Sequence, residues 1–295
     1  MTQPILHQVP FSTGRALPKM TVPAHACDCH HHIYDPIHFP YNLNDKRNQP
    51  PATVEAYRLL QKRLGTERDV IIQASAYGTD NSCLLAALKE TGKKNTRGIA
   101  VCSSDVSEKE LQAMDDLGVC GLRINLASQL KVNKYEEILP LSEKIAALGW
   151  HMQFWIKPDD YFALKAMFLK LHCPMVFDHM GNIPQPAGTK HPAFQLLADL
   201  LKTGNAWLKI SGLDHGTKIG PPTYADTLSV GKAFAALAPE RILWGTDWPH
   251  PSRFTAHEDF PDDAHNLDLL EQEVPDAQKR QLILVENPAK LYRFA

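Results

Sequence analysis

Two kinds of apolar pattern alternate along most of the chain. Short, almost continuously apolar runs are typical of buried strands, and longer segments with apolar residues three and four positions apart are typical of one helix face. The pattern predicts eight strands, at Ala26–Tyr34, Asp69–Ser75, Arg97–Ser103, Val119–Leu126, Trp150–Ile156, Pro174–His179, Ala206–Gly212 and Arg241–Asp247. Helices are predicted between them, among others at Val54–Leu64, Ser82–Thr91, Glu108–Leu117, Tyr135–Leu148 and Ala193–Leu201.

Capping residues mark the ends of several predicted helices. Thr53, Ser107 and Asp159 each precede a helical pattern, and Glu110 can complete a capping box with Ser107. Glycines follow several helices, as a left-handed C-terminal cap requires, at Gly65, Gly92, Gly118, Gly149 and Gly204. These signals support the division into strands and helices.

Strands that alternate with helices predict a parallel sheet covered by helices. Eight such repeats favour an α/β fold of the (β/α)8 TIM barrel type over a doubly wound sheet, and the chain has no GxGxxG or GxxxxGK[ST] motif. We therefore expect an N-terminal arm at residues 1–25 and a single barrel domain at residues 26–295. The polar stretch from Trp248 to Asp263 predicts a long functional loop after the last strand.

The composition excludes several classes of protein. The chain has 295 residues, with 31 Lys and Arg against 33 Asp and Glu, so no excess of basic residues is available for binding nucleic acid. No apolar run approaches the ~20 residues that span a bilayer, and residues 1–20 have no signal-peptide core. The six cysteines form no CxxC pair, which favours reduced, packed cysteines in a cytoplasmic protein.

Reactive residues gather at the predicted ends of three strands. In a TIM barrel the active site lies at the C-terminal ends of the strands. His30 and His32 end the first strand on a shared face, His179 ends the sixth strand, and Asp247 ends the eighth. We therefore expect these four side chains to meet at the mouth of the barrel.

Three imidazoles and one carboxylate allow two kinds of hydrolytic chemistry. They can hold one Zn²⁺ and lower the pKa of its bound water to about 7. Alternatively, the imidazoles polarise a carbonyl oxygen while Asp247 takes a proton from water. Both arrangements bring a nucleophile and an electrophile together for hydrolysis.

Several motifs resemble the amidohydrolase superfamily, in the branch that contains 2-pyrone-4,6-dicarboxylate lactonase and galactarolactone isomerase. They are the DxHxH end of the first strand (Asp28 to His32), DHMG (Asp178 to Gly181) and GTDWPHP (Gly245 to Pro251). Further similar stretches are VIIQASAYGTDN (Val70 to Asn81), GLRINL (Gly121 to Leu126) and LGWHM (Leu148 to Met152). The resemblance runs from about residue 26 to the end of the chain and implies a barrel hydrolase.

The resemblance implies a role for each residue of this group. His30, His32 and His179 would polarise a lactone carbonyl, and Asp247 would activate the attacking water. Arg123 would hold a substrate carboxylate, and the alternative for this side chain is an ion pair across the barrel rim. Relatives in this branch work without metal, so we expect no cofactor. A single zinc ion held by the three histidines and Asp247 is the alternative.

The chain departs from the pyrone-dicarboxylate pattern at positions where that pattern has Arg and Tyr. The corresponding residues are Gln129, Trp155, Asn182 and His215, and Gln, Asn and His cannot reproduce the paired donors of a guanidinium. A different acidic lactone is therefore expected. The isomerase pattern lacks one histidine and has Asn for the final Asp, so the retained Asp247 favours hydrolysis over isomerisation.

Further candidates lie in the segments that follow the strands. The residues expected to contact an anionic substrate, besides Arg123, are Arg47, Asn48, Ser75, Tyr77, Gln129, Trp155, His215, His250 and Ser252. His151 begins the fifth strand, at the end of the barrel opposite the active site, and is expected to be structural. Alternation along the strands predicts that His31 and Asp178 point away from the barrel interior.

These observations together predict a hydrolase that opens a small anionic lactone by adding water. The alternatives are a lactone isomerase, a mononuclear-zinc hydrolase or decarboxylase, and a non-catalytic protein that binds small anions. Asp247 counts against the last, because a carboxylate repels an anionic ligand. The expected partner is a small-molecule lactone, without nucleic acid or membrane, and the chain is expected to be a monomer or a homo-oligomer.

Overall fold

The computed structural model describes residues 8–42, 48–127, 132–256 and 259–295. Its centre is a parallel sheet of eight strands in sequence order, β1 Cys27–His31, β2 Arg68–Ile72, β3 Thr96–Ala100, β4 Val119–Asn125, β5 His151–Trp155, β6 Met175–Phe177, β7 Ala206–Ile210 and β8 Ile242–Trp244. The backbone N–H of Asp247 donates to the carbonyl of His30, and that of His32 donates to the carbonyl of Trp248. These bonds join the segment after β8 to β1, which confirms the predicted TIM barrel.

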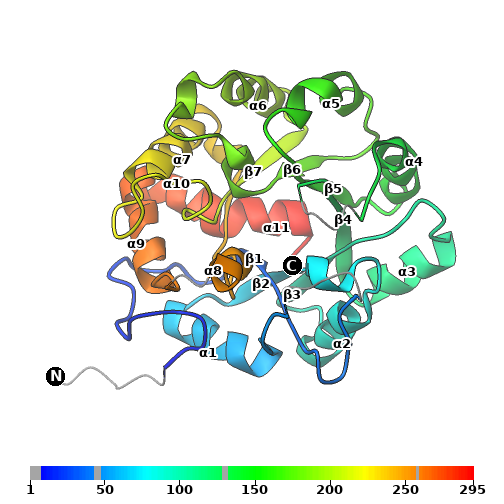
Figure 1. Ribbon diagram of the computed structural model, residues 1–295, viewed down its shortest axis with the longest axis horizontal. Helices are drawn as coiled ribbons and strands as arrows, with labels where there is room; N and C mark the ends of the chain where they lie inside the picture. The colour runs from blue at the N-terminus through cyan, green and yellow to red at the C-terminus, as the bar shows by residue number, and fades with distance from the viewer. Residues whose placement is uncertain (1–7, 43–47, 128–131, 257–258) are drawn as a thin grey trace.

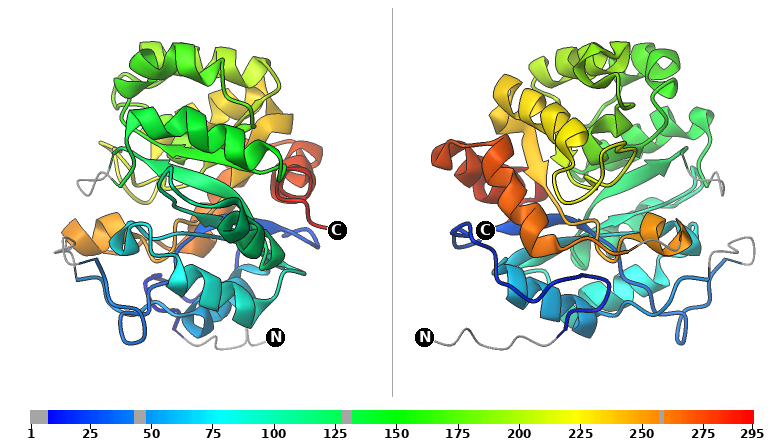
Figure 2. Two further views of the ribbon diagram at one scale, coloured as in Figure 1. Left: turned by 90° about the vertical axis from the view of Figure 1, so that its right-hand side faces the viewer. Right: turned by 60° about the vertical axis from the view of Figure 1, so that its left-hand side comes forward.

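Helices surround the sheet and cover its two ends (Figures 1 and 2). They are α1 Val54–Leu64, α2 Ser82–Thr91, α3 Glu108–Asp116, α4 Tyr135–Ala146, α5 Asp160–Phe168, α6 Pro192–Lys202, α7 Ala225–Leu237, α8 Pro251–Ala256, α9 Asp263–Glu273, α10 Ala277–Gln281 and α11 Asn287–Tyr292. The helix α8 lies within the stretch predicted to be a long loop, so that expectation is corrected. Pro251 begins α8, because its fixed φ suits the first helical turn and its missing N–H costs nothing there.

Two of the three predicted N-terminal caps are confirmed. The side chain of Thr53 accepts a hydrogen bond from the N–H of Ala56, and Ser107 and Glu110 form the complete capping box. The prediction for Asp159 is wrong. Its backbone already has helical angles (φ −68°, ψ −29°), and its side chain makes no capping hydrogen bond, since a cap needs extended backbone to reach the first N–H groups.

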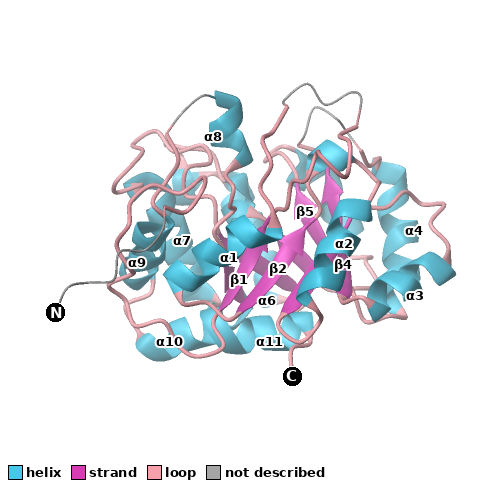
Figure 3. Cartoon of the chain, turned by 90° about the horizontal axis from the view of Figure 1, so that it is seen from below, coloured by secondary structure: helices cyan, strands magenta, loops and turns pink. Residues whose placement is uncertain are grey.

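The interior of the barrel is apolar at one end and polar at the other. Inward side chains of seven strands pack with the C-terminal segment that covers the base; this cluster is Cys27, Cys29, Val70, Ile72, Ile99, Cys120, Val176, Trp207, Leu243, Leu291, Tyr292 and Phe294. Figure 3 shows α10 and α11 at this end and α8 with the connecting loops at the opposite end. The polar side chains described below therefore lie on an apolar floor.

Part of the expected N-terminal arm lies against the outside of the barrel. The guanidinium of Arg63 on α1 donates to the carbonyls of Thr13 and Ala16, and the indole N–H of Trp248 donates to the carbonyl of Pro10. All six cysteines are buried and free, as predicted. No helix in the described ranges combines the length and the apolar character that crossing a membrane requires.

Candidate active site

His30 near the end of β1 and His32 just after the strand both reach the barrel mouth, because β1 contains an irregularity. The register of β1 against β2 shifts between Asp28 and His31. His30 and His32 point inward and are buried. His31 points outward, as predicted: its ring stacks on Tyr57 of α1 with ring centroids 3.5 Å apart.

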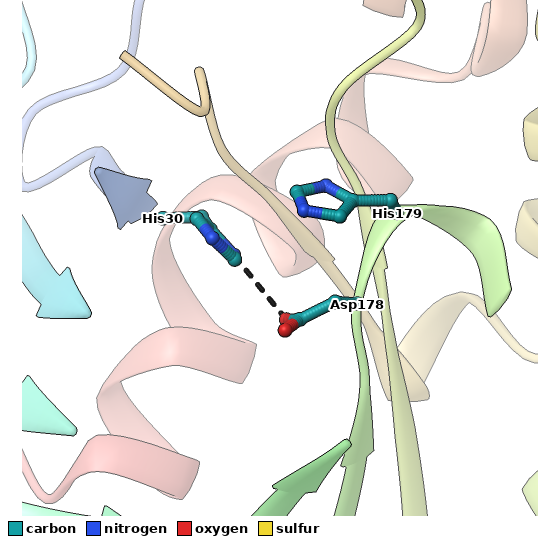
Figure 4. Close-up of side chains that lie close together, drawn as sticks. All are labelled: His30, Asp178 and His179. Atoms are coloured by element: carbon teal, nitrogen blue, oxygen red, sulfur yellow. Dashed lines mark ion pairs between the residues drawn. The ribbon is translucent and has the colours of Figure 1, made fainter. Parts of the chain in front are cut away.

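Asp178 corrects the prediction that it lies outside the barrel. It is fully buried in the interior, with Oδ1 3.2 Å from Nδ1 of His30 and Oδ2 3.1 Å from Nη2 of Arg123. Strand β6 ends at Phe177, and His179 adopts a left-handed backbone conformation (φ 48°). This turn breaks the alternation, so His179 also faces inward, above Asp178 (Figure 4).

The carboxylate of Asp247 is the point on which four imidazoles converge. Its Oδ1 lies 3.4 Å from Nε2 of His30, 3.4 Å from Nε2 of His32 and 3.8 Å from Nε2 of His179. Its Oδ2 lies 3.0 Å from Nε2 of His215, which follows β7. Asp247 has a left-handed backbone (φ 64°), which ends the strand-like alternation after β8. The four residues predicted to meet at the mouth are therefore brought together, with His215 added.

Electrostatics keep three of these imidazoles neutral and the carboxylate ionised. Burial lowers the pKa of His30 and of His32, and lowers that of His179 to about 3. Burial opposes ionisation of Asp247, but the positive charge and the hydrogen bond of His215 help to hold the pKa of Asp247 well below its usual range. A buried carboxylate that stays charged at neutral pH can accept a proton from water.

His215 differs from the other three histidines in its charge. Burial acts to lower its pKa, but Asp214 and Asp247 outweigh burial and raise the pKa of His215 to about 9. Its imidazole is therefore protonated at neutral pH and forms an ion pair with Asp247. This pair anchors Oδ2 of Asp247 and leaves Oδ1 facing the three neutral rings.

A buried polar layer lies directly under the histidines. Oδ2 of Asp178 accepts hydrogen bonds from Nε of Arg123 and from Nε2 of Gln153, and both donor–acceptor distances are 3.1 Å. Nζ of Lys209 on β7 donates to Oε1 of Gln153 over 2.7 Å and lies 3.4 Å from Nδ1 of His30. Arg123 therefore forms the interior ion pair that the sequence left open as its alternative role.

A cavity of about 540 Å³ opens between the segments that follow β4 to β8, and it is lined by His215, the ion-pair partner of Asp247. Trp155, Asn182, His215 and Ser252 line it, all four of which the sequence analysis singled out; the other lining residues are Ala127, Ile156, Lys157, Pro158, Ile183, Pro184, Gln185, Asp214, Gly216, Lys218, Arg253 and Ala256. Among these described residues, Asp214 supplies the only carboxylate against three cationic side chains and His215. The cavity is therefore suited to an anionic ligand.

Several predicted substrate contacts lie away from this cavity. The Ser75 hydroxyl accepts from Nδ2 of Asn125, and the Tyr77 hydroxyl accepts from the backbone N–H of Asp35. Asn48 is exposed and has a left-handed backbone (φ 49°). Two other candidates, at positions 47 and 129 (Arg47 and Gln129), lie outside the described residues.

His250 and His151 are both fully enclosed. Nε2 of His250 lies 3.1 Å from Oδ1 of Asp263 at the start of α9, so this ring ties the loop after β8 to a helix. His151 lies in the apolar base of the barrel near Tyr292, and burial lowers the pKa of His151 to about 3. Its position agrees with the structural role expected from the sequence.

Possible metal ligands occur in three overlapping sets among the described residues. In each set the candidate ligand atoms lie within 4.8 Å of one another; the sets are His30, Asp178 and His179; His30, His32 and Asp247; and His179, His215 and Asp247. The site can therefore present His and Asp ligands to an ion. No set, however, contains both His32 and His179.

Barrel topology and a His/Asp cluster at the strand ends define a class of α/β-barrel enzyme. The family model for amidohydrolases matches residues 27–294, so the chain belongs to the amidohydrolase family. This confirms the resemblance seen in the sequence motifs, and it makes the chain an enzyme of that family.

Three curated relatives of known activity are similar to the chain over almost its whole length. The 2-pyrone-4,6-dicarboxylate hydrolase of Comamonas testosteroni is 32% identical over 285 residues, which cover 93% of this chain and 92% of that one. The 4-sulfomuconolactone hydrolase of Rhizobium radiobacter is 31% identical over 280 residues, with 93% and 92% covered. The D-galactarolactone isomerase of Agrobacterium fabrum is 32% identical over 282 residues, with 94% of each chain covered.

Solved structures agree with the fold. A protein of Agrobacterium tumefaciens in its apo form has a TM-score of 0.87 at 29% identity, covering 97% of this chain and 99% of that one. An amidohydrolase of Burkholderia multivorans with bound zinc has a TM-score of 0.70 at 16% identity, covering 92% of this chain and all of the other. At that identity the second likeness supports the fold alone.

Proposed function

We propose that this protein hydrolyses a small lactone that carries an acidic group. The observation that carries the proposal is the convergence of Nε2 of His30, His32 and His179 on Oδ1 of the ionised Asp247. The relatives that act on acidic lactones by hydrolysis support the same reaction class. The test is product analysis on a panel of sugar-acid, muconolactone-type and pyrone lactones. The proposal fails if the enzyme opens none of them.

In the proposed reaction Asp247 acts as the general base. Oδ1 of Asp247 takes a proton from water as the water oxygen attacks the lactone carbonyl carbon. The carbonyl oxygen becomes an oxyanion, which the neighbouring imidazoles stabilise. The ring C–O bond then breaks, and the proton held by Asp247 passes to the leaving oxygen. The product is a ring-opened acid whose new carboxyl group ionises, so one proton is released per turnover at neutral pH.

The acidic group of the substrate is proposed to occupy the cavity that is lined by His215, the ion-pair partner of Asp247. Lys157, Lys218 and Arg253 line this cavity together with the protonated His215. Nε of Arg253 lies 3.0 Å from Oδ2 of Asp214, which holds the guanidinium at the cavity wall. The positive charge of the side chains that line the cavity also favours entry of an anionic substrate.

Replacing Arg253 by Met is expected to raise KM for an acidic lactone about tenfold or more, with a smaller effect on kcat. A lost hydrogen bond to a charged group costs about 1.5–3 kcal/mol, and this interaction acts equally on bound substrate and transition state. The measurement is steady-state kinetics with the lactone acid and with its neutral methyl ester. Arg280→Met, whose partner Glu271 is on the outer helix α9, serves as the control. An equal rise in KM for acid and ester would contradict the assignment.

We propose that the reaction needs no resident metal. Zinc held by His30, His32, His179 and Asp247 would need all four ligand atoms around one point, but no set within the described ranges joins His32 to His179. A metal-binding histidine ordinarily donates its second N–H to an acceptor. The second nitrogen of His30 has an acceptor in Oδ1 of Asp178, 3.2 Å away, but the ammonium of Lys209 lies 3.4 Å from the same nitrogen and competes for it. The residues present therefore do not fit this four-ligand zinc site.

Chelation gives a direct test of the metal-free proposal. Prolonged dialysis against EDTA is expected to change kcat/KM by less than about twofold, because the carboxylate and imidazoles act without a Lewis acid. Metal content is measured in the same samples by mass spectrometry. Loss of activity that added zinc restores would overturn the proposal and favour the zinc hydrolase.

An isomerase is the second candidate, since one curated relative is a lactone isomerase. In that reaction a hydroxyl group of the substrate replaces water as the nucleophile, and no proton is released. Titration of protons against turnover separates the two reactions. The retained carboxylate of Asp247 supports hydrolysis, because activation of water requires a base at this position.

The charge on His215 predicts an alkaline limit to activity. The raised pKa means that His215 is protonated below about 9 and loses its charge as the pH rises through that value. We expect kcat/KM for an acidic lactone to fall above about pH 9, because the cavity then loses a cation that attracts the substrate. The His215→Gln variant, although slower, is expected to lack this fall. The pH profile is measured after subtracting uncatalysed hydrolysis, and an unchanged alkaline limb in the variant would contradict the role.

A further inference from the structure

The hydrogen-bond partner of His32 fixes which of its ring nitrogens carries the proton. Nδ1 of His32 lies 2.8 Å from the backbone carbonyl oxygen of Ile72 on β2. A carbonyl oxygen only accepts hydrogen bonds, so Nδ1 of His32 must be the donor. In the neutral ring, Nε2 then carries a lone pair. This lone pair faces Oδ1 of Asp247, which is also an acceptor.

The partners of His30 point to the other tautomer. Nζ of Lys209 lies in hydrogen-bond geometry 3.4 Å from Nδ1 of His30, and an ammonium group only donates. The donors and acceptors below it are consistent with this direction, because Gln153 accepts from Lys209 and donates to Asp178. Asp178 Oδ1 lies 3.2 Å from the same nitrogen, yet it has no hydrogen-bond partner within the described residues.

We propose that His30 and His32 are held as opposite tautomers and divide the work of the lactonase reaction between them. His30 presents Nε2–H to the lactone carbonyl oxygen, and His32 presents an Nε2 lone pair to the attacking water. Lys209 is the positioning residue that selects the tautomer of His30. This inference rests on the proposed lactone hydrolysis. It assigns different roles to His30 and His32, for which the sequence motifs implied the same role.

The division of roles accounts for the geometry around Asp247. Nε2 of His32 and Oδ1 of Asp247 are two acceptors 3.4 Å apart, and a water molecule can donate one hydrogen to each. The hydrogen donated to Asp247 is the one transferred during attack, while the other stays on the new hydroxyl group. That arrangement leaves a water lone pair to attack the carbonyl carbon. His30, whose Nε2 lies 3.4 Å from the same carboxylate oxygen, donates to the oxygen that becomes negative.

Burial supports the proposed tautomers because it keeps both rings neutral. His30 and Lys209 are fully enclosed, and His32 is almost so. A doubly protonated ring would donate from both nitrogens, which Lys209 opposes at Nδ1 of His30. A proton on Nε2 of His30 also removes the lone pair that a metal would need. The buried lysine thus links the tautomer to the metal-free chemistry proposed above.

Nuclear magnetic resonance of the intact protein tests the tautomers directly. In the ¹⁵N-histidine-labelled protein, protonated and unprotonated ring nitrogens resonate far apart, and two-bond proton correlations identify the pattern of each ring. His30→Asn and His32→Asn variants assign the two signals. The expected result is a proton on Nε2 of His30 and on Nδ1 of His32. Finding the same tautomer in both rings would overturn the inference.

Lys209→Met tests the role of the lysine. Without the donor, Nδ1 of His30 is expected to take the ring proton and donate to Asp178, and kcat is expected to fall about 100-fold with KM within about threefold. Lys202→Met, at an exposed lysine on α6, is the control. An unmoved His30 signal in folded Lys209→Met would overturn the role of Lys209, and the parent spectrum decides the tautomers even if that variant does not fold.

The two proposals can fail separately. If the parent protein opens no lactone but shows opposite tautomers, the lactonase proposal falls and the tautomer assignment is supported. If it hydrolyses an acidic lactone while both rings share one tautomer, the lactonase proposal stands and the division of roles is overturned.

Discussion

Replacing Asp247 by Asn is expected to lower kcat by about three orders of magnitude while leaving the protein folded. A general base typically contributes 10²–10⁴-fold to the rate, and Asn cannot take a proton from water. The fold is expected to persist because Asn has nearly the same shape as Asp. In the parent, Nε2 of His215 lies 3.0 Å from Oδ2 of Asp247, and the amide oxygen of Asn can still accept a hydrogen bond from it. Steady-state kinetics on the lactone identified by the panel measure the loss.

Two controls make this result specific to the proposed role. Circular dichroism and thermal unfolding of Asp247→Asn show that the barrel is intact, and Asp199→Asn removes an exposed carboxylate of α6 without touching the site. Binding of the acidic lactone to the inactive variant is expected to be retained, because Arg253 and the cavity are unchanged. Turnover within tenfold of the parent would show that another group activates the water.

The fold follows from patterns that act over a few residues. Strands and helices were predicted from apolar periodicity, and helix starts such as Thr53 and Ser107 from local hydrogen bonding. The meeting of His30, His32 and Asp247 was also predictable, since the C-terminal ends of barrel strands lie at one mouth.

The wrong prediction for Asp178 shows that strand alternation does not predict side-chain direction beyond the end of a strand. Strict alternation places neighbouring residues on opposite faces, but β6 ends at Phe177 and the left-handed backbone of His179 turns the next side chain inward as well. A non-glycine residue with positive φ is uncommon and has no clear signature in a single sequence. The depth of Asp178 under His30 could therefore be seen only in the structure.

Residues that matter through long-range contacts were missed for a different reason. Gln153 is one inward position before Trp155 on β5, and alternation alone could have placed it in the barrel. Its partners, however, come from β6 and β7, and nothing local indicates them. Lys218 likewise lines the cavity only because the segment after β7 folds over the barrel mouth beside α8.

Replacing Asp178 by Ala is expected to lower the free energy of unfolding by about 3–5 kcal/mol, which is the usual cost of removing one partner from a buried ion pair. The change leaves the cations of Arg123 and Lys209 enclosed without their shared carboxylate. Burial opposes ionisation of Asp178, but the neighbouring cations of Lys209 and Arg123 help to hold its pKa well below the usual range. Its contribution to stability is therefore present above the unfolded pKa of about 3.9 and lost as the pH falls through the lower folded value.

Urea unfolding of the parent and of Asp178→Ala at neutral pH and at about pH 4 measures both parts of this prediction. Asp199→Ala, at an exposed position of α6, is the control and is expected to change the free energy of unfolding by less than about 0.5 kcal/mol. The difference in free energy of unfolding between the parent and Asp178→Ala is expected to be only slightly smaller at about pH 4. At that pH the Asp178 carboxyl is still ionised in the folded protein, whereas in the unfolded chain it is half protonated. Equal stability of the two proteins at neutral pH would mean that Arg123 and Lys209 find other partners, and that Asp178 does not hold the layer beneath the histidines together.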